Sequence, residues 1–431
     1  MSLTPAFLGE LPLHPTSVNM SLADAGGLGD GHFDNTEVFR EAIQYCFDRG
    51  GGTVVVPQGI WHTGPIHLKS NVRLHLEAGA VIDFDTAFER YLPLVFTRWE
   101  GVECYNYSPL IYAYQASQLA ITGQGEIRGN GAAWWPWKQT QGEAAHKLYD
   151  AEAMGIPVAE RRFGIVGGLR PPLLQFVDCA NILIDGVTFR DGPQWTIHPV
   201  YCENVLIRNV VIHTRGPNTD GINPDSCRNV WIEDCEFSTG DDCIAINSGM
   251  NEDGWRVNRP SEHIYIQRCK MVNGHAGIAI GSGMSGGVKD IHVSQCTFRD
   301  LERGIRLKSI RGRGGIVEDV NISDIQMDNI EREGLTITAF YDASTVPPRS
   351  HSAPLFTRIT FVNIRGRKAQ TGIALYGLED MPISDVRFKD IHFDHLQRGM
   401  IGDNVRHLSF ENVTLLVEGE DNNVEVNKTH G

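Results

Sequence analysis

The sequence predicts an all-β fold, a right-handed parallel β-helix with an N-terminal helical cap. Two observations lead to this fold class. A short pattern of alternating apolar and polar residues recurs along the second half of the chain, and the segments between its copies are rich in Gly and Asn. Strand-like repeats of this kind are typical of a solenoid. The copies begin at Asn181, Asn204, Asn229, His263, Asp290, Asp319, Asp385 and His407, with a degenerate copy over 358–364.

Aligned copies give three apolar columns, two of which lie two residues apart with a polar residue usually between them. This alternation is that of a strand, in which successive side chains point to opposite faces. In a β-helix, equivalent side chains stack from coil to coil and bury one continuous core. The first column contains Ile184, Ile207, Ile232, Ile266, Val293, Ile322, Phe388 and Phe410, and Cys235, Cys269 and Cys296 belong to the second.

The N-terminal residues predict a helix that covers the end of this core. Asp34 is expected to cap it, with Glu37 completing a capping box. Residues 50–52 are all Gly and are expected to end the helix before a strand over 53–56. We therefore predict a cap and first strands over 1–60 and one continuous β-helix domain over 61–431. The inward face of the cap helix is predicted to carry Phe39, Ile43, Cys46 and Phe47.

Two segments interrupt the repeats. Residues 249–262 form a polar insertion, and residues 131–170 carry Trp134, Trp135 and Trp137. Loops inserted on one face of a solenoid often form its binding face. The three tryptophans fit either stacking against a sugar or packing of the insertion on the coils.

Composition and charge limit the kinds of partner that we expect. The 431 residues carry a formal net charge of −15 and no basic stripe, so we expect no nucleic-acid partner. No apolar run approaches a membrane span, and the first ten residues lack the pattern of a signal peptide. The chain as written is therefore expected to be cytoplasmic, or secreted or periplasmic if a signal was removed. The nine cysteines include no CxxC pair, and those in the repeats are expected to be buried small apolar residues.

The candidate catalytic residues are predicted to lie where polar residues recur at one corner of the coils. If strands 221–223, 242–247, 277–281 and 304–309 stack as one sheet, a cluster of acids and bases meets on its exterior. Clustered carboxylates suit glycoside hydrolysis, in which one acid protonates the leaving oxygen and a carboxylate attacks the sugar or activates water. A calcium site is the competing hypothesis, but the neighbouring cations would repel a metal. The predicted cluster is Asp220, Asp241, Asp242, His275, Arg306 and Lys308.

The same motifs resemble those of the polygalacturonases, glycoside hydrolase family 28, whose fold is a right-handed parallel β-helix. The resemblance extends over about residues 20–420 and is greatest to bacterial members. The matching motifs, in chain order, are Asn218-Thr219-Asp220, Gly240-Asp241-Asp242, Gly274-His275-Ala276-Gly277 and Arg306-Leu307-Lys308.

This resemblance implies a role for each residue. Asp241 would be the general acid, and Asp220 and Asp242 would activate the hydrolytic water, with inversion at the anomeric carbon. His275 would support the protonation state of the acid. Substrate would be bound by Asn218, by Arg306 and Lys308 through its carboxylate, and by Tyr341.

The resemblance implies hydrolysis of α-1,4-galacturonosyl linkages in polygalacturonate or oligogalacturonides, by exo action, with no cofactor and no metal. A rhamnogalacturonan hydrolase of the same family is the nearest alternative. A pectate lyase, which needs calcium, and a non-catalytic pectin-binding β-helix also remain open. The sequence does not assign an oligomeric state.

Overall fold

The computed structural model describes residues 5–12, 18–164, 167–341 and 350–419, and the backbone of 424–430. Residue contacts divide the chain into two compact units. The first comprises most of the chain up to Glu236, and the second comprises residues from Phe237 onward together with Glu100–Val102 and Pro224–Ser226.

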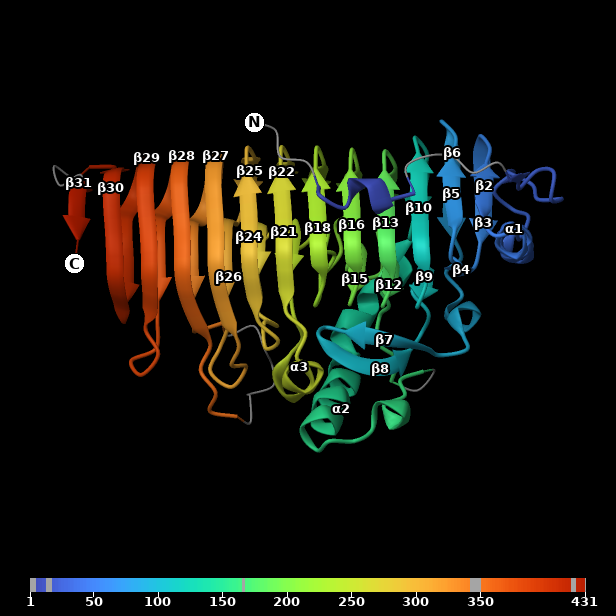
Figure 1. Cartoon of the computed structure of the whole chain (residues 1–431), viewed down its shortest axis with the longest axis horizontal. Coiled ribbons are helices and arrows are strands. Elements are labelled where there is room, and N and C mark those ends of the chain that lie inside the picture. The colour runs from blue at the N-terminus through green and yellow to red at the C-terminus, as the bar shows by residue number, and fades with distance from the viewer. Residues whose placement is uncertain (1–4, 13–17, 165–166, 342–349, 420–423, 431) are drawn as a thin grey trace. The chain divides into compact units, whose positions relative to one another are not determined.

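In the first unit, parallel strands stack into three ladders, and each coil adds a strand to every ladder that it reaches (Figure 1). One ladder contains β1 (Asn19–Ser21), β2 (Gly52–Val56), β5 (Val72–Leu76), β10 (Ser117–Gly123), β13 (Ala180–Asp185), β16 (Glu203–Arg208) and β18 (Arg228–Glu233). The second contains β3 (Gly59–Thr63), β6 (Ala80–Phe84), β11 (Glu126–Arg128), β14 (Thr188–Arg190) and β17 (Val211–His213). The third contains β4 (Ile66–His67), β9 (Ile111–Tyr114), β12 (Leu174–Val177) and β15 (Ile197–Val200).

The register of these ladders follows the predicted columns. Ile184 pairs with Ile121 on one side and with Ile207 on the other, and Ile207 pairs in turn with Ile232. Each of these side chains is almost fully buried. The predicted parallel stacking of like side chains is therefore confirmed in this unit.

The second unit has the same three-ladder organisation, but its later strands are longer. Three of them run through all three ladders as continuous strands: β27 (Ile316–Thr338), β28 (Leu355–Tyr376) and β29 (Ile383–Asp403). They are followed by β30 (Val405–Val417), and β31 (Val424–His430) pairs antiparallel with β30. The shorter strands are β19 (Glu236–Ser238), where the units meet in sequence, and β20 (Ile244–Ile246), β21 (Ser261–Gln267), β22 (Lys270–Val272), β23 (Ala276–Ile280), β24 (Val288–Ser294), β25 (Thr297–Leu301) and β26 (Arg303–Lys308).

Aromatic side chains stack in the core of this unit. The rings of Phe361 and Phe388 lie 5.3 Å apart and nearly parallel, and Phe410 continues the stack at 5.3 Å. In a neighbouring column, a Cβ atom on Gly366 would lie 2.1 Å from the ring of Phe393. Only glycine fits there, because the ring of the next coil occupies the space that a side chain would need.

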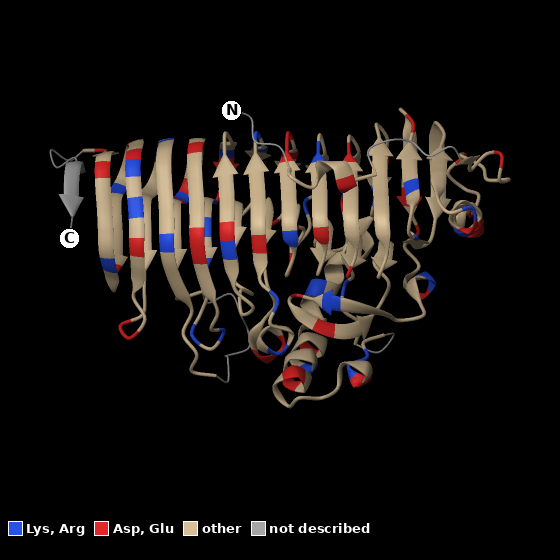
Figure 2. Ribbon diagram, in the orientation of Figure 1, with Lys and Arg blue, Asp and Glu red and all other residues tan. Residues whose placement is uncertain are grey.

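These long strands carry both acidic and basic residues (Figure 2). Arg358 on β28 lies 2.7 Å from Asp319 on β27, and Glu411 on β30 lies 2.8 Å from both Arg387 and Lys389 on β29. Because these pairs are largely exposed, each contributes little to stability.

The N-terminal cap is the helix α1 (Thr36–Asp48), as predicted, but its details differ from the prediction. The N-cap residue is Asn35, and Asp34 instead accepts a hydrogen bond from the amide of Thr36 at 3.1 Å. Glu37 pairs with Arg40 at 2.7 Å and does not complete a capping box. Phe47 is 41% exposed, so the inward face is narrower than expected and carries Phe39, Ala42, Ile43 and Cys46.

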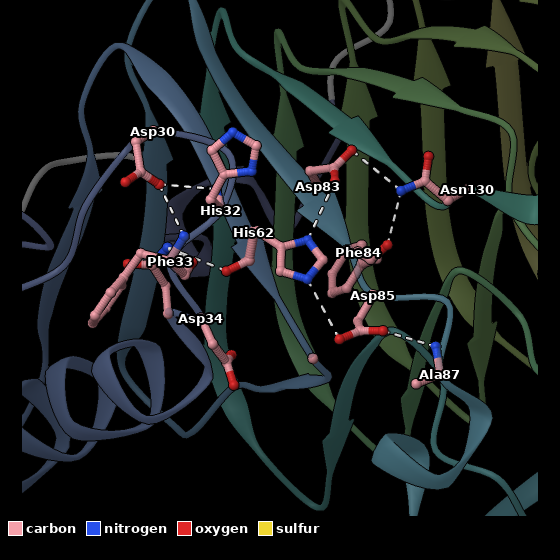
Figure 3. A network of polar contacts seen from close by, with 12 residues as sticks. Asp30, His32, Phe33, Asp34, His62, Asp83, Phe84, Asp85, Ala87 and Asn130 are labelled. Carbon is pink, nitrogen blue, oxygen red and sulfur yellow. Dashed lines mark hydrogen bonds and ion pairs between the residues drawn. The ribbon is translucent and has the colours of Figure 1, made fainter.

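A polar network joins the cap to the first coils (Figure 3). The ring of His62 lies between two carboxylates, 3.4 Å from Asp83 and 3.4 Å from Asp85. Arg90 binds Asp34, next to α1, at 2.6 Å and Asp85 at 3.1 Å. These contacts fix the start of α1 against the coil edge.

Both predicted insertions contain a helix. Residues 249–262 include α3 (Asn251–Val257), which the polar sequence did not predict, and residues 131–170 include α2 (Gly142–Ala153). Trp134 is fully buried, and its ring lies 4.5 Å from Phe88 and 5.1 Å from Trp137. For Trp134 the packing alternative therefore holds. A two-stranded sheet of β7 (Val95–Trp99) and β8 (Val102–Asn106) precedes this insertion.

All nine cysteines are buried and free, as expected for small apolar core residues. Among the described residues, no helix is both long and apolar enough to cross a membrane.

The phenylalanine stack gives a test of the core. We expect Phe388→Ala to lower the free energy of unfolding by about 3–5 kcal/mol, because it opens a cavity between two rings. Phe340→Ala is the matched control, since that ring is 58% exposed, and its cost should stay within about 0.5 kcal/mol. Urea denaturation followed by circular dichroism would measure both, and equal costs would contradict a stacked core at this position.

Candidate active site

Asp241 and Asp242 lie in the turn between β19 and β20, within the second unit. The turn is fixed by its own hydrogen bonds, since the hydroxyl of Thr239 donates to the carbonyl of Asp241 at 2.7 Å and the amide of Asp242 donates to Asp241 Oδ1 at 2.9 Å. The Asp241 side chain is 17% exposed and that of Asp242 only 3%. The two adjacent carboxylates therefore have different surroundings.

Lys308, at the end of β26, neutralises the buried carboxylate. Its Nζ lies 2.7 Å from Asp242 Oδ2, and its side chain is only 7% exposed. Burial is the strongest single influence and disfavours the ammonium ion, but the combined attraction of Asp242, Tyr341 and Asp241 still raises the pKa of Lys308. Asp242 is thus held beside a permanent cation, which suits a carboxylate that must remain ionised.

His275 is the partner of the second carboxylate. Its Nδ1 lies 3.1 Å from Asp241 Oδ1, and its backbone amide donates to the carbonyl of Asp241 at 2.9 Å. The hydrogen bond to Asp241 raises the pKa of His275, more than burial lowers it. Burial is the strongest single influence on Asp241 and acts to raise its pKa, but the hydrogen bond and charge of His275, together with Lys308 and the amide of Asp242, lower the pKa of Asp241 overall. In the free protein the shared proton therefore resides mainly on the imidazole.

Arg306 and Lys308 both lie close to one aromatic ring. The guanidinium carbon of Arg306 lies 5.1 Å from the ring centre of Tyr341, and Lys308 Nζ lies 5.0 Å from it. Burial, followed by repulsion from Arg303, lowers the pKa of Arg306. Its buried Nε has no hydrogen-bond partner among the residues that the structure describes. A buried donor without a partner is costly, and a carboxylate would satisfy it.

A third cation adjoins this ring. Arg313 is almost fully buried, lies 5.9 Å from the ring centre of Tyr341 and donates to the hydroxyl of Ser282. The sequence motifs gave no reason to single out Arg313. Its position becomes evident only when the loop after β26 is seen folded against Tyr341.

Asn218 and Asp220 belong to the first unit and are held by its buried residues. Asp220 Oδ2 accepts a hydrogen bond from Asn223 at 2.9 Å, and the amide of Thr196 donates to the carbonyl of Asp220 at 2.9 Å. Asn218 Oδ1 accepts from Arg170 at 2.9 Å. Arg170 is fully buried and also binds the carbonyls of Pro193 and Pro217, so it fixes the turn that carries both motif residues.

The structure therefore brings together six of the predicted residues within the second unit and describes the other two within the first. The six are Asp241, Asp242, His275, Arg306, Lys308 and Tyr341. The sequence analysis did not single out Glu302, which lies beside His275. The only feature of the sequence that could have pointed to Glu302 is its position just before the Gly304–Lys308 motif.

A groove of about 800 Å³ runs from His275 along the turns of the second unit. Its lining is mainly polar, which suits a hydroxyl-rich ligand better than an apolar one. It includes Thr239, His275, Glu302, Glu331, Arg367 and Gln397.

Comparison with known proteins identifies the family. Residues 166–411 match the model of the glycosyl hydrolases family 28. The chain belongs to this family. It is therefore a glycoside hydrolase with the parallel β-helix fold, and the resemblance inferred from the four motifs is confirmed.

Relatives and solved structures agree with this assignment. The chain is 36% identical to an exopolygalacturonase of Thermotoga maritima, described as hyperthermoactive, with a TM-score of 0.91 over 97% of this chain and 96% of that one. A Yersinia enterocolitica family 28 exopolygalacturonase shares the fold at 20% identity, with a TM-score of 0.72 over 91% of this chain and 78% of that one.

A probable polygalacturonase of Vitis vinifera is 34% identical over 325 residues, which are 72% of this chain. The chain spans 61% of the length of that relative.

The buried ion pair gives a second test. We expect Lys308→Met to lower the free energy of unfolding by about 3–5 kcal/mol at neutral pH, because it leaves Asp242 buried without its cation. The control Lys289→Met breaks a pair with Glu262 at 3.0 Å whose lysine is 47% exposed, and should cost about 1 kcal/mol or less. Equal losses in urea denaturation would refute the buried pairing.

Proposed function

We propose that this protein is an exo-acting polygalacturonase, which hydrolyses the α-1,4 linkage at one end of a galacturonate chain with inversion of the anomeric carbon. The observation that carries the proposal is the cluster of Arg306 and Lys308 around Tyr341, directly beside the carboxylate pair Asp241 and Asp242. This arrangement offers a site for an acidic sugar next to groups that can cleave its linkage. Family membership and the likeness to the Thermotoga exopolygalacturonase over almost the whole chain support it.

Substrate binding begins, in this proposal, with the carboxylate of one galacturonate. This carboxylate accepts a hydrogen bond from the Arg306 Nε that has no partner among the described residues, and it lies near Lys308. Tyr341 contacts the sugar ring. The family resemblance assigns Asn218 to substrate binding as well. A guanidinium binds a carboxylate in a defined orientation, which places the glycosidic oxygen with respect to Asp241.

Asp241 is the general acid. The arriving carboxylate adds negative charge and displaces water, and both effects raise the proton affinity of Asp241. Asp241 then takes the proton that it shares with His275 and gives it to the glycosidic oxygen as the bond from C1 to that oxygen breaks. The leaving sugar departs with a new hydroxyl group.

The attacking water is activated by Asp242, and the family resemblance assigns Asp220 to the same step. Asp242, whose carboxylate is paired with Lys308, accepts a proton as the water oxygen bonds to C1. Water attacks the face opposite the leaving group, and the product has the inverted anomeric configuration. Each turnover consumes one water molecule, and no residue becomes covalently bound.

The role of Asp241 is tested by Asp241→Asn. We expect turnover on galacturonate trimers to fall by about 10²–10⁴-fold, because the amide has no proton to donate to the leaving oxygen. The control Asp324→Asn changes an exposed aspartate on the long strand β27, which accepts a hydrogen bond from Asn363 at 2.6 Å. It should keep wild-type turnover. If Asp241→Asn keeps it too, while both variants remain folded, another residue is the acid.

The mode of cleavage is tested by the products. Polygalacturonate and its trimers are digested, and product sizes are followed from the first per cent of reaction. Exo action predicts monomer alone from the start, and inversion predicts the β-anomer first in proton NMR spectra.

Other outcomes identify the alternatives. A ladder of oligomers would show endo action. Unsaturated products that absorb in the ultraviolet would show a lyase. Binding of polymer without new reducing ends would show a non-catalytic protein, and cleavage of rhamnogalacturonan alone would show the other branch of the family.

A further inference from the structure

His275 faces a carboxylate at each of its ring nitrogens. Nδ1 lies 3.1 Å from Asp241 Oδ1, and Nε2 lies 4.0 Å from Glu302 Oε2. A neutral imidazole has one N–H donor and one bare nitrogen, so it can donate to only one carboxylate. The imidazolium ion donates a hydrogen bond to Asp241 at Nδ1 and attracts the Glu302 carboxylate at 4.0 Å through its charge, so this arrangement favours the charged form of His275.

Glu302 is held in place from behind. Its Oε1 binds Arg303 and lies 3.3 Å from Arg332 Nε, which leaves Oε2 directed towards His275. Backbone hydrogen bonds also hold the Glu302 coil against the His275 coil, because the amide of Glu302 donates to the carbonyl of Gly274 at 2.9 Å. The amide of Arg303 donates to the carbonyl of His275, also at 2.9 Å. Glu302 thus occupies one position of the next coil, directly beside the imidazole.

The charges around His275 favour its cation. Asp241 contributes most to its raised pKa, followed by Asp242 and Glu302, while burial acts in the opposite direction. Arg303 and Arg332 partly offset Glu302, and Lys308 is already engaged with Asp242. The His275 side chain is 52% exposed and borders the groove of about 800 Å³, so water can reach it.

We propose that Glu302 is a positioning residue that holds His275 in its cationic form, and that His275 thereby returns a proton to Asp241 after each turnover. This inference rests on the proposed function, in which Asp241 loses its proton to the leaving oxygen. The imidazolium Nδ1–H passes its proton to the Asp241 carboxylate. The neutral imidazole then regains a proton from solvent in the groove, and the proton that Asp242 took from the attacking water is released to solvent, so each turnover consumes no net proton.

The chain offers a matched pair of variants. Glu302 and Glu333 both bind Arg303, and their side chains are 23% and 21% exposed. They differ in two contacts, because Glu302 faces His275 at 4.0 Å through Oε2 and also pairs with Arg332 at 3.3 Å. Glu302→Gln and Glu333→Gln therefore remove the same charge from the same arginine, and only Glu302→Gln removes it from beside His275.

The first measurement is the pH profile of kcat/KM on galacturonate trimers. Loss of the Glu302 charge disfavours the imidazolium, so His275 should deprotonate at lower pH and activity should fall earlier as the pH rises. We expect the basic limb to move down by about one pH unit in Glu302→Gln and by less than about 0.3 in Glu333→Gln. Glu302→Asp keeps the charge, so the basic limb of its pH profile should lie close to that of the wild-type protein.

The second measurement needs no substrate. Histidine-labelled protein is titrated by NMR, with the His275 signal assigned by its loss in His275→Gln, at temperatures well below the unfolding midpoint of each variant. The His275 titration should move down in Glu302→Gln and stay in Glu333→Gln. An unmoved titration, or equal movement in both variants, overturns the inference. If the titration moves as expected but the wild-type protein cleaves no galacturonan, the proposed function fails and the Glu302–His275 coupling stands.

Discussion

The structure depends on the in-register pairing of parallel strands. Each coil places its residues beside the equivalent residues of the previous coil, so a position in one copy of the repeat determines its neighbours in space. Ile244 pairs with Ile278, which pairs with Ile305, and this single register sets where the adjoining turns project their side chains. Asp241, His275 and Glu302 meet because each occupies the same turn of successive coils, although they are far apart in sequence.

The adjacent carboxylates Asp241 and Asp242 have different partners and therefore different proposed roles in catalysis. Asp242 is buried against Lys308, and its charge is compensated by a group that does not titrate near neutral pH. Asp241 faces His275, which is half exposed and whose pKa this contact raises. One carboxylate is thus paired with a buried cation, and the other with an imidazole that solvent can reach. Adjacent residues in the sequence acquire opposite behaviour because different coils supply their partners.

Much of this arrangement could be predicted from the sequence, and the limits have physical causes. The apolar columns and the motif residues were legible because the repeat aligns them, and Asp241, Asp242, His275, Arg306 and Lys308 do meet. Glu302 and Arg313 were missed because a single charged residue at a turn looks like any solvated one until its neighbours are placed. The start of α1 was misassigned by one residue, since Asp34 and Asn35 are both good capping residues. The helix α3 was missed because a short polar helix depends on tertiary contacts more than on its own propensity.

The last strand has a consequence for assembly. Every earlier coil leaves its backbone amides and carbonyls available to a following parallel coil, so the final coil would present an open template for another molecule. The strand β31 runs the other way and occupies that template along β30, from Ser409 opposite His430 to Leu415 opposite Val424. A following parallel coil therefore cannot pair directly with β30, because seven residues of reversed polarity already lie along it.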